Sequence, residues 1–509
     1  MRTKYKNQAI DPTELKKFQL GLERESIRTT PTGKMSQLPH PLSLGSPLLH
    51  PTIKTDFSEA QIEYATSKNN SLPSLIKELK LLHAFTYKVN PSELLWPFSM
   101  PPVLPPSDSK IPLANYGTSS SAWLKTTYRK GLGHRYGRRM QTVSGIHFNI
   151  SIHPTLLKNI LERDKSLTTS CLYFGTIRNY SKIAHILIYL FGSSPMADRS
   201  YSKGNSNLSI FDKHTWFGEF ATSLRLSPLG YVSEVQNQFP VSLNSLSEYI
   251  RDLCKMVSTP YPDFIPFEIG RKQLSANVLQ LENEYYSMIR PKEPLKKNER
   301  TLEALEKRGV SYLEVRVLDV DPFSEIGVDM KTLKFLELIV LDCFLRESPN
   351  TNFNDKKIWV ENQKRVSLQG RKPGLKILER GKEVSFQETA KTYVESLFYA
   401  ASLLDNSNQD YTKVVQEQLR KIENPYETPS AKVIDLARKN RFSFVDLGLA
   451  IAEKQREELQ NFPLTKDQET TWKNEVTQSL FLLKQMEREV LTPKMKTLPP
   501  IHLKSCNHV

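Results

Sequence analysis

Glycine, cysteine and long apolar runs are all scarce in this chain. Only 20 of its 509 residues are glycine, and it contains neither a G-x-x-x-x-G-K-[ST] phosphate loop nor a dinucleotide-binding glycine turn, so any nucleotide must be bound by other means. The four cysteines are widely separated and form no C-x-x-C pair, which excludes a disulfide-stabilised mini-protein and a zinc site of that spacing. The longest apolar run, from Ile186 to Phe191, is far too short to cross a bilayer, and the first residues lack an apolar export segment. We therefore expect a cytoplasmic protein with no membrane partner.

Positive charge exceeds negative charge by 15, because 70 lysines and arginines stand against 55 acidic residues. Such an excess is compatible with nucleic acid, a membrane surface or anionic small molecules as partners. Basic and acidic residues are nevertheless mixed along the whole chain, as in residues 292–300, and there is no long basic arm. A lysine-rich proteome explains the charge more simply, so we expect no nucleic-acid partner, and a basic nucleic-acid-binding protein is the weaker alternative.

Neither a repeat nor a clear linker divides the chain. The proline clusters at residues 39–51 and 97–106 are interleaved with aromatic and apolar side chains, which indicates ordered loops within a larger unit. A protein of 58.5 kDa can bury roughly three quarters of its surface, so one large core is feasible. We therefore expect a single domain over residues 1–509.

The central and C-terminal regions have different hydrophobic patterns. Strand-like alternation recurs over residues 145–319, whereas apolar side chains over 390–404 and 472–490 have helical spacing. This contrast predicts a mainly helical part over residues 385–491, followed by a flexible tail over 492–509.

Two segments near the N-terminus are rich in carboxylates. In Gly21–Glu25, alternation along a strand would put Glu23 and Glu25 on one face, roughly 7 Å apart. Such a pair needs a divalent cation or a basic neighbour, although an isolated E-x-E is more often a solvated strand face. Residues 55–63 predict a capped helix in which Glu59 and Glu63 share a face at i, i+4.

Residues 140–150 predict a strand with an apolar face and a polar face. Ile146, Phe148 and Ile150 would be buried, so His147 and Asn149 would point the other way. A lone histidine of this kind is usually structural, yet its neutral nitrogen could complete a carboxylate metal site or bind phosphate.

Residues 311–319 predict a second strand of this type, on which Glu314 and Arg316 project together. A carboxylate beside a guanidinium is commonly a cross-strand ion pair, but it also suits a metal together with phosphoryl oxygens. The apolar face of this strand would consist of Leu313, Val315 and Val317.

Two further stretches alternate in the same way and predict strands, at residues 223–227 with Arg225 and at residues 279–286 with Glu282, Glu284 and Tyr286. In a sheet covered by helices on its other side, such polar faces would converge into a funnel suited to divalent metals and anions together. Further cations that could face this funnel are Lys125, Arg129, Arg135 and Arg371.

Together these segments resemble the proteobacterial type 1 family of glutamate–cysteine ligases, also called γ-glutamylcysteine synthetases. The resemblance holds in order and approximate spacing from about residue 20 to residue 375. It is carried by Gly21–Glu25, Thr55–Phe57 with Glu63, Trp96–Pro101, Tyr116–Ser119, Arg135–Gly137, Met140–His147, Ala221–Leu226, Asn277–Gln280, Ile289–Lys292, Glu314–Arg316, Pro322–Ser324 and Gly370–Leu375.

The resemblance implies an α+β, glutamine-synthetase-like fold, in which an antiparallel sheet forms an active-site cup backed by helices. The whole chain would be one catalytic ligase domain, acting as a monomer. The cup would hold ATP as co-substrate and two or three Mg²⁺ or Mn²⁺ ions. The metal positions implied by the family are Glu23, Glu25, Asp56, Glu63, His147 and Glu314.

The resemblance also implies the positions that handle the substrates. Arg225 and Arg316 correspond to catalytic arginines that bind the substrate carboxylate and the phosphate being transferred. Lys125, Arg129 and Arg371 are candidates for the ATP phosphates. The cysteine pocket implied by the family consists of Phe57, Tyr128, Leu132, Gln141, Tyr231 and Tyr286.

The implied reaction is ATP-dependent ligation of the γ-carboxylate of L-glutamate to the amine of L-cysteine. It would pass through γ-glutamyl phosphate and give γ-glutamylcysteine, ADP and phosphate, the first step of glutathione biosynthesis. A related carboxylate–amine ligase with another amine acceptor is the main alternative. A further alternative is a structural protein that uses metals only for stability. Such a protein would show a melting temperature that rises with metal, without ATP turnover.

Overall fold

The computed structural model describes residues 18–202, 208–230, 232–296 and 299–488. Tyr231 and the tail predicted over residues 492–509 lie outside the described residues. Within the described part, none of the helices combines the length and apolarity needed to cross a membrane.

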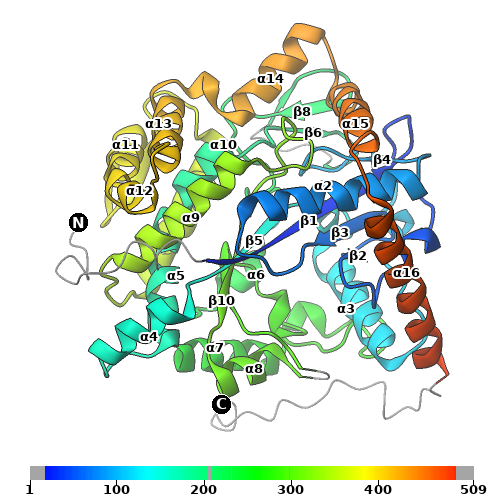
Figure 1. Ribbon diagram of the computed structural model, residues 1–509, viewed down its shortest axis with the longest axis horizontal. Helices are drawn as coiled ribbons and strands as arrows, with labels where there is room; N and C mark the ends of the chain where they lie inside the picture. Colours follow the sequence, from blue (N-terminus) through cyan, green and yellow to red (C-terminus); the bar gives the residue numbers. More distant parts are fainter. Residues whose placement is uncertain (1–17, 203–207, 231, 297–298, 489–509) are drawn as a thin grey trace.

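An antiparallel sheet lies at the centre of the structure (Figure 1). Its strands follow the order β2-β3-β1-β5-β10-β9, and the short β4 pairs antiparallel with the end of β1. The bounds are β1 (Gln19–Thr29), β2 (Ile53–Thr55), β3 (Gln61–Ala65), β4 (Leu94–Leu95), β5 (Ile146–Ser151), β9 (Ile289–Lys292) and β10 (Tyr312–Leu318). Smaller sheets are formed by β6 (Met196–Asp198), β7 (Ser209–Ile210) and β8 (Thr215–Phe217), and by β11 (Lys376–Glu379) with β12 (Lys382–Ser385).

Helices cover one face of this sheet, while other helices and loops surround its polar side. The helices in the first three quarters of the chain are α2 (Leu72–Val89), α3 (Ser120–Tyr136), α4 (Pro154–Arg163), α5 (Thr169–Phe191), α6 (Glu234–Asn237), α7 (Leu246–Ser258), α8 (Thr301–Arg308), α9 (Met330–Leu345) and α10 (Phe353–Gln369). Helix α2 packs on β1 and β3, and α5 packs on β9, β10 and α9 (Figure 1).

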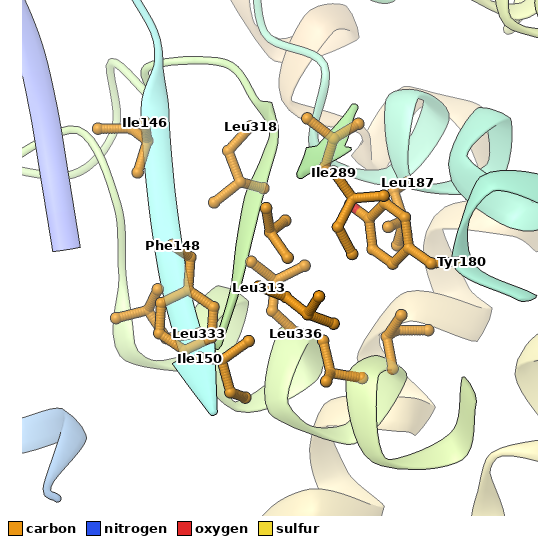
Figure 2. Packing of buried hydrophobic residues seen from close by; sticks show 14 of the residues in the cluster. Ile146, Phe148, Ile150, Tyr180, Leu187, Ile289, Leu313, Leu318, Leu333 and Leu336 are labelled. Carbon is orange, nitrogen blue, oxygen red and sulfur yellow. The ribbon is translucent and has the colours of Figure 1, made fainter. Parts of the chain in front are cut away.

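The apolar alternation of the strands explains which face the helices cover. Phe148 on β5 and Leu313 on β10 are completely buried. Figure 2 shows them in one apolar layer with Leu333 and Leu336 of α9. Because successive side chains alternate across a strand, this burial directs the intervening polar residues to the opposite face of the sheet.

The C-terminal part of the described chain is helical. Its helices are α11 (Phe386–Ser396), α12 (Phe398–Leu404), α13 (Asp410–Glu423), α14 (Pro429–Asn440), α15 (Phe444–Gln460) and α16 (Lys466–Glu487). The stretch with helical spacing over residues 390–404 thus forms two helices, which are separated at Leu397. Helix α15 packs on α2, and α16 runs along the edge of the molecule beside η1 (Leu42–Leu44) (Figure 1).

Four local predictions are wrong, and two of them concern where a helix or strand forms or begins. Residues 55–63 are not a helix but the β2–β3 hairpin, because Ile53 and Tyr64 pair across the turn and are both fully buried. Residues 140–142 form the 3₁₀ turn η3 (Met140–Thr142), so the strand predicted from residue 140 begins only at Ile146.

Two predicted strands are also replaced by turns. Residues 223–227 turn because Ser227 Oγ donates to the carbonyl of Leu224 and Pro228 follows. Residues 282–284 form the 3₁₀ turn η5 (Glu282–Glu284), in which the Glu284 carboxylate accepts the Gln280 N–H at 2.8 Å. In both cases local side-chain hydrogen bonds compete successfully with strand pairing.

A carboxyl buried in the helical core makes stability depend on pH. Burial raises the pKa of Glu337 on α9 from its ordinary 4.5 to about 7, against the opposing effects of the Tyr411 hydroxyl, 2.7 Å away, and Lys334. The folded state therefore binds this proton more tightly than the unfolded state, and that contribution is lost as the pH rises through the folded pKa. Because of Glu337, the free energy of unfolding should fall by roughly 3 kcal/mol between about pH 4.5 and 7. We expect this fall to be absent in Glu337→Gln. Denaturant unfolding of both proteins across this range measures the difference, and parallel pH profiles would contradict it.

Candidate active site

The register of the central strands gathers acidic residues and one histidine on the polar face. Glu23 of β1 lies opposite His147 of β5, and Glu25 lies opposite Glu63 of β3. His147 Nδ1 is 3.2 Å from Glu23 Oε2, and its Nε2 is 3.7 Å from Glu25 Oε1. Asn149, two residues further along β5, donates to the other Glu23 oxygen at 2.8 Å. Three strands far apart in sequence therefore converge on one cluster.

His147 is buried beneath these carboxylates in a neutral form. Burial lowers the pKa of His147 from its ordinary 6.5, and the nearby Arg316 lowers it further. With its proton on Nδ1 toward Glu23, the imidazole keeps a lone pair on Nε2. A neutral imidazole is the form that binds a metal ion.

Glu314 extends the cluster toward the edge of the sheet. Its carboxylate is 2.6 Å from Lys292 Nζ on β9 and is also paired with Arg316 on its own strand. Burial would raise the pKa of Glu314, but Lys292, Arg316 and His147 outweigh it and hold that pKa well below its usual value. Glu314 and Arg316 thus project together, as their alternation predicts.

At the other end of the cluster, acidic groups crowd one another. Burial raises the pKa of Glu25 well above 4.5, and the charges of Asp56 and Glu63 raise it further. Burial, Asp56 and Glu23 raise the pKa of Glu63 to about 7. Arg129 on α3, 3.8 Å from Asp56, and Lys54, opposite Glu63 on β2, lower the pKa of Glu63 but do not outweigh these effects.

The second predicted arginine reaches the cluster from a loop. Arg225 is buried, and its Nη2 donates to the carbonyl of Arg316 at 3.1 Å. A Cβ atom on Gly145 would overlap the Arg225 guanidinium, so glycine is needed for this close approach. The N–H of Gly145 donates to Glu25 at 2.9 Å. Arg225 and Glu25 therefore lie on either side of the same glycine.

A cavity of about 440 Å³ adjoins the two arginines. Arg225, Arg316 and Tyr286 all line it, together with Trp359 of α10 and Met288. The volume and the mixture of aromatic and charged groups suit small polar molecules.

The residues predicted for the cysteine pocket come together in two groups. Phe57, Tyr128 and Leu132 belong to one hydrophobic cluster at α3. Gln141 is 3.4 Å from the hydroxyl of Tyr286. Tyr231, the remaining predicted member, lies outside the described residues.

The three cations predicted for the ATP phosphates are divided. Lys125 and Arg129 stand together on α3 over the ring of Tyr116, at 5.4 and 4.7 Å from its centroid. Burial, followed by the charge of Arg129, lowers the pKa of Lys125 to about 8. Arg371 instead donates to the carbonyls of Glu219 and Ala221, and no described contact connects it to the other two.

Several candidates from the sequence serve structural ion pairs. Arg135 pairs with Glu284 at 3.1 Å, and both are fully buried there. Glu282 pairs with Arg300 at 2.5 Å. Glu59 caps loop backbone, because its carboxylate accepts the N–H groups of His40 and Asn115.

Sequence reasoning did not predict that Lys292 contacts the cluster. It belongs to a segment that carries the family resemblance, and alternation along β9 places it on the same face as Arg290, which lies opposite Glu314. Three positive groups therefore surround one carboxylate. Only the pairing of β9 with β10, which alternation does not reveal, brings Lys292 to Glu314.

A glycine in α3 lies close to the predicted cysteine pocket. A Cβ atom on Gly131 would overlap the side-chain amide of Gln280, whose Nε2 donates to the carbonyl of Tyr128 at 3.2 Å. We expect Gly131→Ala to displace Gln280 and α3, raising KM for cysteine several-fold and destabilising the fold by about 1 to 3 kcal/mol. Steady-state kinetics with cysteine or 2-aminobutyrate varied would measure this. An unchanged KM for cysteine in the folded variant would show that the position of Gln280 does not affect the predicted cysteine pocket.

Divalent cations fit the donor groups of this cluster. In the described part of the chain, no group of three or more His, Cys, Asp or Glu side chains is already arranged to hold a metal ion. The carboxylates of Glu23, Glu25 and Glu63 beside a neutral imidazole are nevertheless donors that Mg²⁺ or Mn²⁺ accepts. Burial, and after it the repulsion between neighbouring carboxylates, raises the pKa values of Glu25 and Glu63, and a bound cation would offset both effects. Asn149 Oδ1, beside Glu23, is buried without a hydrogen-bond partner among the described residues.

Comparison with known proteins shows which family the chain resembles. The family model described as glutamate–cysteine ligase matches residues 5–366. The glutamate–cysteine ligase of Leptospira interrogans serovar Lai is 41% identical over 498 residues, covering 96% of this chain and 95% of that protein. The glutamate–cysteine ligase of Alcanivorax borkumensis is 38% identical over 455 residues, covering 86% of each.

Solved structures show the same likeness. The glutamate–cysteine ligase of Francisella tularensis in complex with AMP has a TM-score of 0.90 at 33% identity, and 97% of each chain is covered. A bifunctional glutathione synthetase from Pasteurella multocida, with a TM-score of 0.68 and 22% identity, covers 88% of this chain and 52% of that one and shares the fold. The expected α+β fold, with an antiparallel sheet backed by helices, is confirmed. The protein belongs to the glutamate–cysteine ligase family.

Proposed function

We propose that this chain forms γ-glutamylcysteine from L-glutamate and L-cysteine with hydrolysis of ATP to ADP and phosphate. The observation that carries this proposal is that the strand register puts Glu23, His147, Glu314 and Arg316 on one polar face, where Arg225 reaches the carbonyl of Arg316 from a loop. Acids that can hold cations, next to arginines that can hold anions, suit a reaction in which a phosphoryl group is transferred between two negatively charged substrates.

The carboxylate of glutamate must be activated before an amine can displace one of its oxygens. A γ-carboxylate oxygen attacks the γ-phosphorus of ATP, the bond to ADP breaks, and γ-glutamyl phosphate forms. The neutral cysteine amine then attacks the acyl carbon, phosphate leaves with its bonding electrons, and the nitrogen releases a proton to the solvent as the amide forms. Arg316, partly buried beside Glu314, is placed to neutralise negative charge on the phosphoryl oxygens in both steps. Arg225 is the candidate for orienting the substrate carboxylate through its planar fork.

Glu23, Glu25, Asp56, Glu63, His147 and Glu314 are the residues that would hold Mg²⁺ or Mn²⁺. When bound, these ions would neutralise charge on the ATP phosphates. Lys125 and Arg129, stacked together near Asp56, are the better-placed candidates for further phosphate contacts, and the contacts of Arg371 give it no support. The monomeric and cytoplasmic states and the absence of a nucleic-acid partner stay predictions.

Metal binding has a readout other than activity. We expect Mg²⁺ or Mn²⁺ to stabilise the protein by about 3 kcal/mol at a hundredfold excess over its dissociation constant, because the cation relieves carboxylate repulsion in the folded state only. Glu63→Gln should reduce this shift in the unfolding midpoint. Glu59→Gln is the matched control, because this nearby buried carboxylate binds loop backbone instead, and it should keep the full shift. Equal shifts in both variants would remove Glu63 from the metal site.

The direct test measures phosphate release and product together. Phosphate released from Mg-ATP is followed with glutamate alone and then with cysteine or 2-aminobutyrate, while mass spectrometry identifies the dipeptide. Stoichiometric γ-glutamylcysteine is the expected result. Stimulation by a different amine would keep the mechanism and change the acceptor, whereas no ATP turnover with any metal would overturn the proposal.

A further inference from the structure

Asp319 lies directly behind Arg225, at the end of β10, and is not itself on the polar face of the sheet. Its carboxylate is 3% exposed, and its Oδ1 is 3.7 Å from Arg225 Nη1. Asp319 is not among the metal or substrate positions considered above. A buried carboxylate requires compensation from its surroundings, so its partners show what it does.

Serine groups from two loops hold the Asp319 carboxylate. Oδ2 accepts the backbone N–H of Ser193 at 2.9 Å and the hydroxyl of Ser194 at 2.6 Å. Oδ1, the oxygen that faces Arg225, accepts the hydroxyl of Ser223 at 2.9 Å. These three donors fix both oxygens without using the guanidinium, so the carboxylate is already oriented when Arg225 meets it.

The same serines also hold the backbone that carries Arg225. The carbonyl of Ser194 accepts the N–H of Leu224 at 2.7 Å, and its hydroxyl accepts the N–H of Arg225 at 3.4 Å. Ser223 adjoins Ser194 in an isolated parallel bridge. Since residues 223–227 are a turn rather than a paired strand, this bridge and Asp319 replace the sheet as the support of Arg225.

The guanidinium is thereby held from two sides. Asp319 approaches Nη1 from behind, while Nη2 donates to the carbonyl of Arg316. Gly145 closes a further side, because no larger residue would leave room for the guanidinium. Without these contacts, the long side chain of Arg225 would lose considerable rotamer entropy on binding an anion.

We propose that Asp319 is the positioning residue for Arg225, and that Ser194 and Ser223 hold it in place for this task. The inference rests on the proposed function, because it assumes that Arg225 binds the substrate carboxylate. Asp319 contacts no substrate itself. It fixes the direction of the guanidinium fork, and so determines affinity for glutamate more than affinity for the other substrates.

The test compares Asp319→Asn with Asp342→Asn. Asp342 on α9 is also buried and pairs with Arg346 at 2.5 Å, so it controls for the loss of a buried ion pair. We expect Asp319→Asn to lower kcat/KM for glutamate about 10- to 100-fold, with KM for cysteine changed less than about twofold. We expect Asp342→Asn to leave the glutamate kinetics unchanged. The same pattern of kinetics in both variants would overturn the inference.

Two further measurements separate this inference from the proposed function. In the double variant Asp319→Asn with Arg225→Lys, the two effects should not add, because both act through one guanidinium. Hydrogen exchange of the amides in residues 222–226 should become faster in Asp319→Asn, whatever the reaction is. Full additivity together with unchanged exchange would overturn the positioning role.

Failure of each idea has its own signature. If Arg225→Lys has normal kinetics for every substrate, the role of Arg225 in the proposed function fails, and exchange at residues 222–226 alone decides whether Asp319 positions it. If Arg225→Lys is impaired and Asp319→Asn is not, only the positioning role fails. Ser223→Ala, which removes one donor to Asp319 and keeps its charge, is the milder variant if Asp319→Asn does not fold. It should show the same selective loss for glutamate at a smaller size, and an unchanged kcat/KM for glutamate would overturn the inference.

Discussion

Glu314→Gln is expected to reduce formation of γ-glutamylcysteine by about a thousandfold or more while leaving the fold largely intact. The carboxylate lies between Lys292 and Arg316, at 2.6 Å from the lysine. Glutamine keeps the size of the side chain but removes its charge. Lys292 and Arg316 then lose their ion-pair partner, and the cup loses a carboxylate that could bind a metal ion. The buried neighbours Leu313 and Val315 are on the opposite face of β10 and are not altered.

The measurement is product formation with Mg-ATP, glutamate and cysteine, together with the thermal midpoint. Glu282→Gln is the matched control, because Glu282 is also a buried glutamate paired with an arginine, Arg300, but lies outside the cluster. That control is expected to lose stability and keep kcat. Near-normal turnover of Glu314→Gln would exclude Glu314 from the catalytic machinery.

The parts of the fold that the sequence predicts correctly are strands whose alternation is reinforced by burial. On β1, β5 and β10, apolar residues such as Leu22, Phe148 and Leu313 face the helices, which turns Glu23, His147 and Glu314 to the other side. A shift of one residue in any of these strands would bury the acids, so the alternation determines the orientation strongly. The polar face of the cup was therefore predictable from local sequence.

Residues 55–63 show where local sequence is insufficient. Thr55 and Asp56 have the pattern of a helix start, but an N-cap stabilises a helix by only about 1 kcal/mol, and the glutamates at i, i+4 repel each other. Pairing of β3 with both β1 and β2, and complete burial of Ile62, outweigh it. The prediction still assigned Glu63 to the site, because that assignment came from the family resemblance and not from the helix.

The supporting residues of the site depend on long-range pairing. Lys292 reaches Glu314 through the β9–β10 register, and Asp319 meets Ser194 across 125 residues of sequence. Arg225 was expected on a strand and comes from a turn, yet its guanidinium arrives at the cup. The sequence shows which residues carry charge. It does not show which charged residues contact each other, because those contacts depend on strand register and loop packing.

Arg316→Lys is expected to lower kcat about a hundredfold with a smaller change in KM for ATP. Lysine keeps one positive charge but has no planar fork, so it cannot donate to Glu314 and to a phosphoryl oxygen in the same geometry. Removing a preorganised donor from a developing negative charge costs about 10²- to 10³-fold in rate. Lys292 continues to pair with Glu314 in the variant, which preserves the local fold.

The step affected can be isolated by leaving out cysteine. If Arg316 acts on the transferred phosphoryl group, single-turnover formation of ADP from Mg-ATP and glutamate alone should slow by the same factor as kcat. Arg346→Lys is the control, because Arg346 is also partly buried and pairs with a buried carboxylate, that of Asp342. The described side-chain contacts of Arg346 are with α9 and α11 and not with the cluster. Normal ADP formation in Arg316→Lys with slow dipeptide formation would move the role of Arg316 to the second step, where the amine displaces phosphate. Normal rates in both steps would exclude Arg316 from stabilising the transferred charge, and would leave bound metal ions, Lys292 and Arg225 as its source.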